Sequence, residues 1–206
     1  MPRWIPEQKW LDVDAFIIGG GDSLRGFDFN LLKKEMTIGC NAAFLLGEDI
    51  CKLCLIGDIK CFNKFNGKLS KYKGIVFTNA PQLLHSKILW LWTMGREGKG
   101  LHKHALGWNN CTGFSALNLA LILGANPVYL LGFDMKLSKD GKANWHNEGD
   151  KPNSEVYTKF LANEKRVAVD LKNNFSTQQV INITDDSALT VFPKIGVKEF
   201  WEGRRL

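Results

Sequence analysis

The stretch "FIIGGGDSL", residues 16–24, decides the fold, because a short apolar segment runs directly into three glycines, an acid and a serine. Apolar residues without polar alternation are typical of strands that are buried on both faces of a parallel sheet. Glycine allows a tight turn, and it also allows a phosphate to approach the backbone N–H groups closely. The stretch therefore predicts a buried strand that ends at a ligand site or at a plain tight turn.

Further apolar runs of similar length follow along the chain. The predicted strands span residues 15–18, 37–40, 51–56, 74–78, 88–93, 128–133 and 180–184. Helical or loop patterns separate most of these runs, and such alternation predicts a mostly parallel sheet. We expect one Rossmann-like α/β domain over residues 1–206, with helices on both faces of the sheet and one long late loop.

Two segments have the pattern of helices. Apolar residues recur at helical spacing over residues 153–174, which predicts the longest helix of the chain. Residues 105–133 carry no charge, but the turn residues at 123–127 divide them into a buried helix, 114–123, and a strand. The sequence therefore predicts no membrane span.

Composition narrows the class of protein. The chain has 206 residues, of which 45% are hydrophobic and 23% charged, as in an ordinary globular domain. Its net charge of +6 suits a protein that handles phosphates, yet it is too modest to favour nucleic acid. The basic stretch 60–73 fits a solvated amphipathic helix better than a nucleic-acid surface.

The cysteines and the first residues of the chain both indicate a protein that is not exported. Five cysteines are an odd number in a chain too large to depend on disulfides, and several lie in apolar runs, so we expect a cytoplasmic protein. The first residues, "MPRWIPEQKW", lack the apolar core of a signal peptide. We therefore expect no export.

The glycine turn does not match the familiar nucleotide motifs. A dinucleotide fingerprint has glycine or alanine three residues after Gly21, where Leu24 stands, and an acid at the end of the second strand, where Asn41 stands. A P-loop has lysine and a hydroxyl residue after its last glycine, but Phe27 follows Gly26. NAD-type and Walker-type sites are therefore not predicted.

Three segments in order carry a resemblance to a known family. They are "FIIGGGDSLRGFDFNLL", "TIGCNAAF" and "CTGFSALNLALILGANPVYLLGFDM", followed by His146. The trio resembles the bacterial CMP-sialic-acid-dependent sialyltransferases. It is also similar to their relatives among motility-accessory glycosyltransferases and archaeal hydroxymethylpterin diphosphokinases, which include phage proteins. The resemblance covers roughly residues 14–134.

The resemblance implies roles for particular residues. In those enzymes the glycine loop and the asparagine that closes the second strand hold a cytidine nucleotide, and Asn41 matches that asparagine. A small hydroxyl residue at the start of the later helix also faces the nucleotide, as Thr112 would here, where free N–H groups favour an anion. A histidine of the late loop is the general base, which implies His146. The candidate nucleotide-binding residues are Gly19, Gly20, Gly21, Ser23, Asn41, Thr112, Gly113 and Asp134.

The chain departs from the sialyltransferase pattern at two points. Gly20 stands where those enzymes have an asparagine, and the loop after "LLGFDM" lacks the tyrosines that stabilise their leaving phosphate. The nearest tyrosine along the chain, Tyr157, lies beyond Trp145 and His146. These departures favour nucleotide binding over sialyl transfer.

Three functions remain open. The preferred one is transfer of a sugar from a nucleotide-sugar to an acceptor hydroxyl, with His146 as the base and no metal cofactor. The second is a Mg²⁺-dependent diphosphokinase built on Asp58 and Asp134 at strand ends, with Glu148 and Asp150 more typical of a solvated loop. The third is a nucleotide-binding protein without turnover.

Overall fold

The computed structural model describes residues 3–4, 8–80, 82–83, 85–94, 98–146 and 153–204. Within these residues, eight strands form one sheet in the order β1-β6-β5-β4-β3-β2-β7-β8, and every neighbouring pair is parallel. The strands are β1 (Arg3–Trp4), β2 (Ala15–Ile18), β3 (Met36–Cys40), β4 (Leu53–Leu55), β5 (Ile75–Thr78), β6 (Ile88–Leu91), β7 (Val128–Leu131) and β8 (Val180–Asn182). The predicted parallel α/β class is confirmed.

Each of the seven predicted apolar runs contains a strand, although most strands are shorter than the run. The run 88–93, for example, leaves the sheet after Leu91, and Thr93 makes only an isolated bridge to Leu106. The sequence analysis missed β1, whose two residues pair with β6 at the edge of the sheet. A strand of two residues is too short to show an apolar run.

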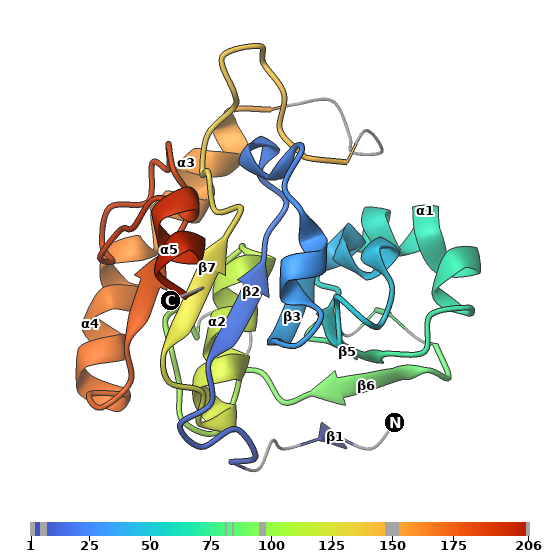
Figure 1. The fold of residues 1–206 in the computed structure, drawn as a ribbon. Coiled ribbons are helices and arrows are strands. Elements are labelled where there is room, and N and C mark those ends of the chain that lie inside the picture. The colour runs from blue at the N-terminus through green and yellow to red at the C-terminus, as the bar shows by residue number, and fades with distance from the viewer. Residues whose placement is uncertain are drawn as a thin grey trace.

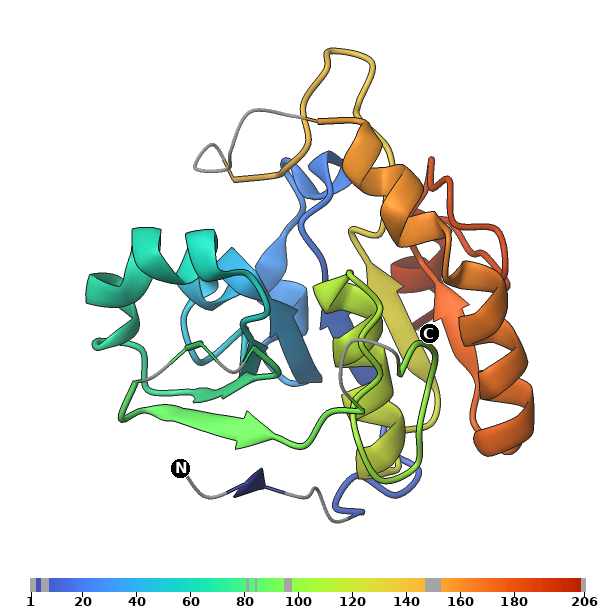
Figure 2. The same ribbon diagram turned by 180° about the vertical axis from the view of Figure 1, so that it is seen from behind.

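Helices cover both faces of the sheet, as predicted. On one face lie α2 (Thr112–Leu123) and α4 (Glu164–Asn174), and on the other lie α1 (Ile59–Leu69) and α5 (Val197–Arg204). Figure 1 shows α5 in front of β7, and Figure 2, from behind, shows α2 across the sheet. The strand β2 is buried along its whole length because its alternate side chains enter both cores.

The helix α2 is the centre of one core. Every residue of this helix after Thr112 is buried, including the polar Ser115 and Asn118, so the helix is buried all round rather than on one stripe. It ends at Gly124, which adopts the left-handed conformation with φ of +94° that closes many helices. No helix in the described part of the chain has both the length and the apolar character needed to cross a membrane.

The prediction of one long helix over residues 153–174 is wrong. The structure has two helices there, α3 (Glu155–Leu161) and α4. Between them lies the buried Asn163, whose side-chain Nδ2 donates to the backbone oxygen of Asn109 at 3.1 Å. The helix is interrupted at this residue, whose amide bonds a distant segment of the chain. The helical spacing of apolar residues in the sequence continues across the interruption and does not reveal it.

The order of the strands reverses between β2 and β7. From β2 the chain moves outward through β3, β4, β5 and β6, and it returns through α2 to β7 on the other side of β2. In open α/β sheets, ligands bind in the crevice at the carboxyl ends of the strands at such a switch point. The loop that follows β7 rises above these ends (Figure 1).

Candidate functional site

The glycine turn after β2 packs against the backbone that leaves β7. The N–H of Gly19 donates to the oxygen of Leu131 at 2.8 Å, and that of Gly21 donates to the oxygen of Gly132 at 2.9 Å. A Cβ on Gly19 would lie 2.4 Å from the Gly132 oxygen, and one on Gly21 would lie 2.0 Å from Oδ1 of Asp134. Both positions therefore require glycine for packing between the two strand ends, whatever the turn binds.

Ser23 and Asp134, two candidate nucleotide-binding residues, bind each other. The buried Asp134 accepts the backbone N–H of Ser23 on Oδ2 at 2.9 Å and the Ser23 hydroxyl on Oδ1 at 2.5 Å. Burial raises the pKa of Asp134, with the bonds from Ser23 opposing and the nearby Asp22 carboxylate adding to the rise. Of the three glycines only Gly20 is partly exposed, so it is the part of the turn that a ligand can reach.

The late loop folds back onto the glycine turn through Trp145. Its indole N–H donates to the oxygen of Gly19 at 3.2 Å, and its backbone N–H donates to the oxygen of Gly20 at 3.1 Å. The indole ring also packs against Phe29, with 5.1 Å between ring centroids, and edge-to-face against His146 at 5.0 Å. These contacts hold Trp145 against the glycine turn, and His146 is the next residue of the loop.

Tyr157 of α3 reaches the same end of the sheet. Its hydroxyl donates to the backbone oxygen of Ala143 at 3.4 Å, which joins α3 to the late loop. Burial raises the pKa of Tyr157, and the carboxylates of Asp134 and Asp22 raise it further. A phenol therefore faces the switch point although no tyrosine lies in the loop itself.

The side chain of Asn41, directly after β3, bonds the backbone that follows β4 and the first residue of α2. Its Oδ1 accepts the backbone N–H groups of Gly57 at 3.1 Å and Asp58 at 3.3 Å, and its Nδ2 donates to Oγ1 of Thr112 at 3.3 Å. The backbone at Asn41 has φ of +52°, a conformation that asparagine tolerates better than most residues. This contact brings two of the candidate nucleotide-binding residues, Asn41 and Thr112, together at the carboxyl edge.

The start of α2 lies beside the end of β7. A Cβ on Gly113 would lie 2.7 Å from the ring of Phe133, so the helix and the strand end are in close contact. The N-cap residue Cys111 makes no side-chain capping bond, and burial raises the pKa of its thiol to about 11. The helix begins at the carboxyl edge of the sheet, and its first N–H groups have no side-chain cap.

The sequence analysis missed Asn79, which directly follows β5. Asn79 is buried, and its Nδ2 donates to Oγ of Ser115 in α2 at 3.2 Å. A Cβ on Gly57 would lie near both Asn79 and Thr112, so Asn79 belongs to the same cluster as Asn41. The available signal was a polar residue immediately after a predicted strand, the same position that identified Asn41.

The structure gives Asp58 and Asp134 separate roles. Asp58 is the N-cap of α1, and its Oδ1 accepts two N–H groups of the first turn at 2.8 Å and 3.4 Å. Across the described residues, no group of three or more His, Cys, Asp or Glu side chains is arranged to hold a metal ion. Glu148 and Asp150 lie outside the described residues.

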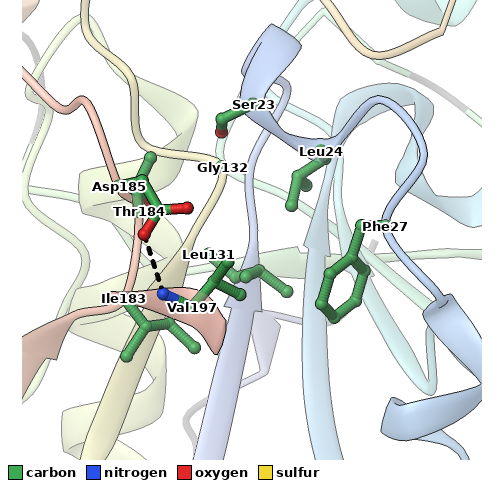
Figure 3. Close-up of a pocket in the computed structure, with 9 residues that line it drawn as sticks. All are labelled: Ser23, Leu24, Phe27, Leu131, Gly132, Ile183, Thr184, Asp185 and Val197. Carbon is green, nitrogen blue, oxygen red and sulfur yellow. Dashed lines mark hydrogen bonds between the residues drawn. The ribbon is translucent and has the colours of Figure 1, made fainter. Parts of the chain in front are cut away.

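A small pocket opens behind the switch point (Figure 3). It holds about 210 Å³ of empty space, part of it open solvent. In Figure 3 a hydrogen bond joins Oδ1 of Asp185 to the backbone N–H of Val197, at 2.9 Å, on one wall. The lining residues are Ser23, Leu24, Phe27, Leu131, Gly132, Ile183, Thr184, Asp185 and Val197. Of the candidate nucleotide-binding residues this pocket contains only Ser23, so it is separate from the cluster of Asn41 and Thr112.

Two solved structures share this fold. The MAf glycosyltransferase from Magnetospirillum magneticum AMB-1 aligns with 96% of this chain at a TM-score of 0.63 and 11% identity, but the match covers only 36% of that protein. The sialyltransferase CstII from Campylobacter jejuni, solved with the substrate analogue CMP-3FNeuAc, aligns with 88% of this chain and 84% of its own at a TM-score of 0.50 and 14% identity. No protein-family model matches the chain, and no curated protein matches its sequence. At such identities the likeness shows the fold alone.

Proposed function

We propose that this chain is a glycosyltransferase of sialyltransferase type, which transfers a sugar from a nucleotide-sugar to an acceptor hydroxyl. The fold is shared with two glycosyltransferases. The observation that supports the proposal is the contact of Trp145 with Gly19 and Gly20, because His146 directly follows Trp145 and its ring packs edge-to-face against the indole.

The proposed reaction assigns a role to each part of the site. His146 takes the proton of the acceptor hydroxyl, whose oxygen attacks the anomeric carbon of the sugar. The bond between that carbon and the nucleotide phosphate breaks, and the phosphate leaves with the electron pair. Thr112 and the N–H groups that begin α2 receive the negative charge, and the hydroxyl of Tyr157 turns from the oxygen of Ala143 to donate to it. This chemistry uses no metal ion.

The first sugar donor to test is a cytidine nucleotide-sugar. CstII, which shares the fold, was solved with a CMP-sugar analogue. In our proposal Asn41 and Thr112 hold the nucleotide while the partly exposed Gly20 borders the reacting sugar.

Consumption of CMP-sialic acid in the presence of hydroxyl acceptors tests the proposal. We expect turnover that persists in EDTA and falls by a factor of about 10² to 10⁴ in His146→Ala. His104→Ala is the matched control, because the exposed His104 lies in the loop before α2, and it should retain full turnover.

The other two functions give different results in the same assay. A diphosphokinase would consume ATP, would stop in EDTA, and would lose more activity in Asp58→Asn or Asp134→Asn than in His146→Ala. If neither donor is consumed while a nucleotide still binds, the chain is a binding protein and the proposal is wrong.

A further inference from the structure

Asn79 has a buried side-chain oxygen that nothing in the described structure satisfies. The residue is 8% exposed, and among the described residues no group donates a hydrogen bond to its Oδ1. The orientation of the amide is fixed by Ser115, whose hydroxyl donates to the backbone oxygen of Gly107 at 3.2 Å. Because that hydroxyl must then accept, the Nδ2 of Asn79 faces Ser115 and the oxygen faces the other way.

The oxygen lies beside Gly57, on the side where Thr112, the first residue of α2, also approaches. A Cβ built on Gly57 would lie 3.2 Å from Oδ1 of Asn79 and 2.7 Å from Oγ1 of Thr112, so both oxygens border the same point. Gly57 and Thr112 are only half-buried, and these two residues lie between this side of the Asn79 oxygen and the surface. Any side chain at position 57 would occupy this approach.

The cluster presents two complementary kinds of group. The uncapped N–H groups of α2 favour an anion, whereas a carbonyl oxygen accepts a hydrogen bond and does not attract a phosphate. A buried acceptor without a donor is unfavourable, and a ligand that supplies the donor removes that cost. A nucleotide offers both a phosphate and, on its nucleoside, hydroxyl and amino donors.

We propose that Asn79 is a specificity-determining residue that accepts a hydrogen bond from a neutral donor of the bound nucleoside, either a ribose hydroxyl or the amino group of cytosine. This inference rests on the proposed function, since it requires a nucleotide at the carboxyl edge of the sheet.

Isothermal titration with four probes tests the inference: CMP, 2′-deoxy-CMP, 3′-deoxy-CMP and UMP. In the wild type, the analogue that lacks the donor should bind about five- to tenfold more weakly than CMP. In Asn79→Leu, CMP should bind about as weakly as that analogue, and the difference between the two should vanish. The identity of the sensitive analogue tells a ribose hydroxyl from the amino group.

Controls separate the possible failures. Asn63→Leu, at an exposed position of α1, should leave the affinity for CMP unchanged, and Asn79→Ser serves if the leucine variant does not fold. If the wild type binds CMP and every probe changes equally in the Asn79 variants, the inference is wrong while the proposed function stands. If the wild type binds none of the four probes, both are wrong.

Discussion

Asp134 accepts two hydrogen bonds from Ser23, a residue 111 positions earlier in the chain, through both of its carboxylate oxygens. The pair joins the turn after β2 to the backbone after β7, where the order of the strands reverses. Within the structure, a serine and an acid that we assigned to a nucleotide hold the two halves of the site together.

Titration of Asp134 should make stability depend on pH. Burial raises its pKa in the folded protein above the unfolded value of about 3.9. Between these two values the folded state binds more protons, so the stability contributed by this group falls as pH rises through the window. The free energy of unfolding of the wild type minus that of Asp134→Asn should therefore decrease as pH rises above about 3.9 and then level off. Urea unfolding across pH measures this difference, and a constant value would contradict the prediction.

Gly19→Ala should destabilise the fold. The new Cβ would meet backbone atoms of Leu131 and Gly132, which cannot rotate away as a side chain can. We expect a loss of about 1–3 kcal/mol in the free energy of unfolding. The control is Gly67→Ala, because Gly67 lies in α1 with nothing near its Cβ position, and it should gain about 0.5–1 kcal/mol. Urea unfolding compares the variants, and a neutral Gly19→Ala would show that the two strand ends separate easily.

Two substitutions at Asn41 distinguish its side chain from its backbone. Both Asn41→Gly and Asn41→Ala remove the amide that bonds Gly57, Asp58 and Thr112. Only alanine also places a Cβ in the left-handed region, at φ of +52°. The free energy of unfolding of Asn41→Ala should therefore be lower than that of Asn41→Gly by about 1 kcal/mol. Chemical denaturation gives the order, and equal stabilities would mean that the backbone relaxes out of this conformation.

Trp145→Phe should loosen the late loop without unfolding the domain. Phenylalanine can still pack against Phe29 but loses the N–H that donates to the oxygen of Gly19. Backbone amides of residues 143–146 should exchange hydrogen faster, with little change in the global melting temperature. Hydrogen exchange followed by mass spectrometry reports this, with the exposed Trp92, near the far edge of the sheet, changed to Phe as the control. Unchanged exchange in the loop would show that the backbone bond to Gly20 and the ring contact with Phe29 hold it without the indole N–H.

CMP should stabilise the protein. A ligand at about a hundred times its dissociation constant adds roughly 2.7 kcal/mol. For a chain of 206 residues, this should raise the melting temperature by roughly 5 to 10 °C. Thermal melts with CMP, CTP, UMP, GTP and ATP measure the shift, and flat curves with all five would exclude the nucleotide site.

The sequence alone determined the class of fold and the edge of the sheet that carries the candidate site. Continuous apolar runs identify strands buried on both faces, and the seven predicted runs all contain parallel strands. Residues that follow such runs gather at one edge because parallel strands end on the same side, which is why Asn41, directly after β3, lies beside Gly57 and Asp58, which follow the run 51–56.

Only the tertiary structure decided which partners those residues take. Gly19 and Gly21 are required because Gly132 and Asp134 approach them. Within 153–174 the two helices are separated at Asn163, where its amide bonds a backbone oxygen 54 residues away. Periodicity and turn residues report whether a segment is buried or bends. They do not report which distant group meets a particular side chain. In the sequence Asn79 is only a single polar residue after a strand, and its unsatisfied oxygen is evident only from the packing of α2 beside it.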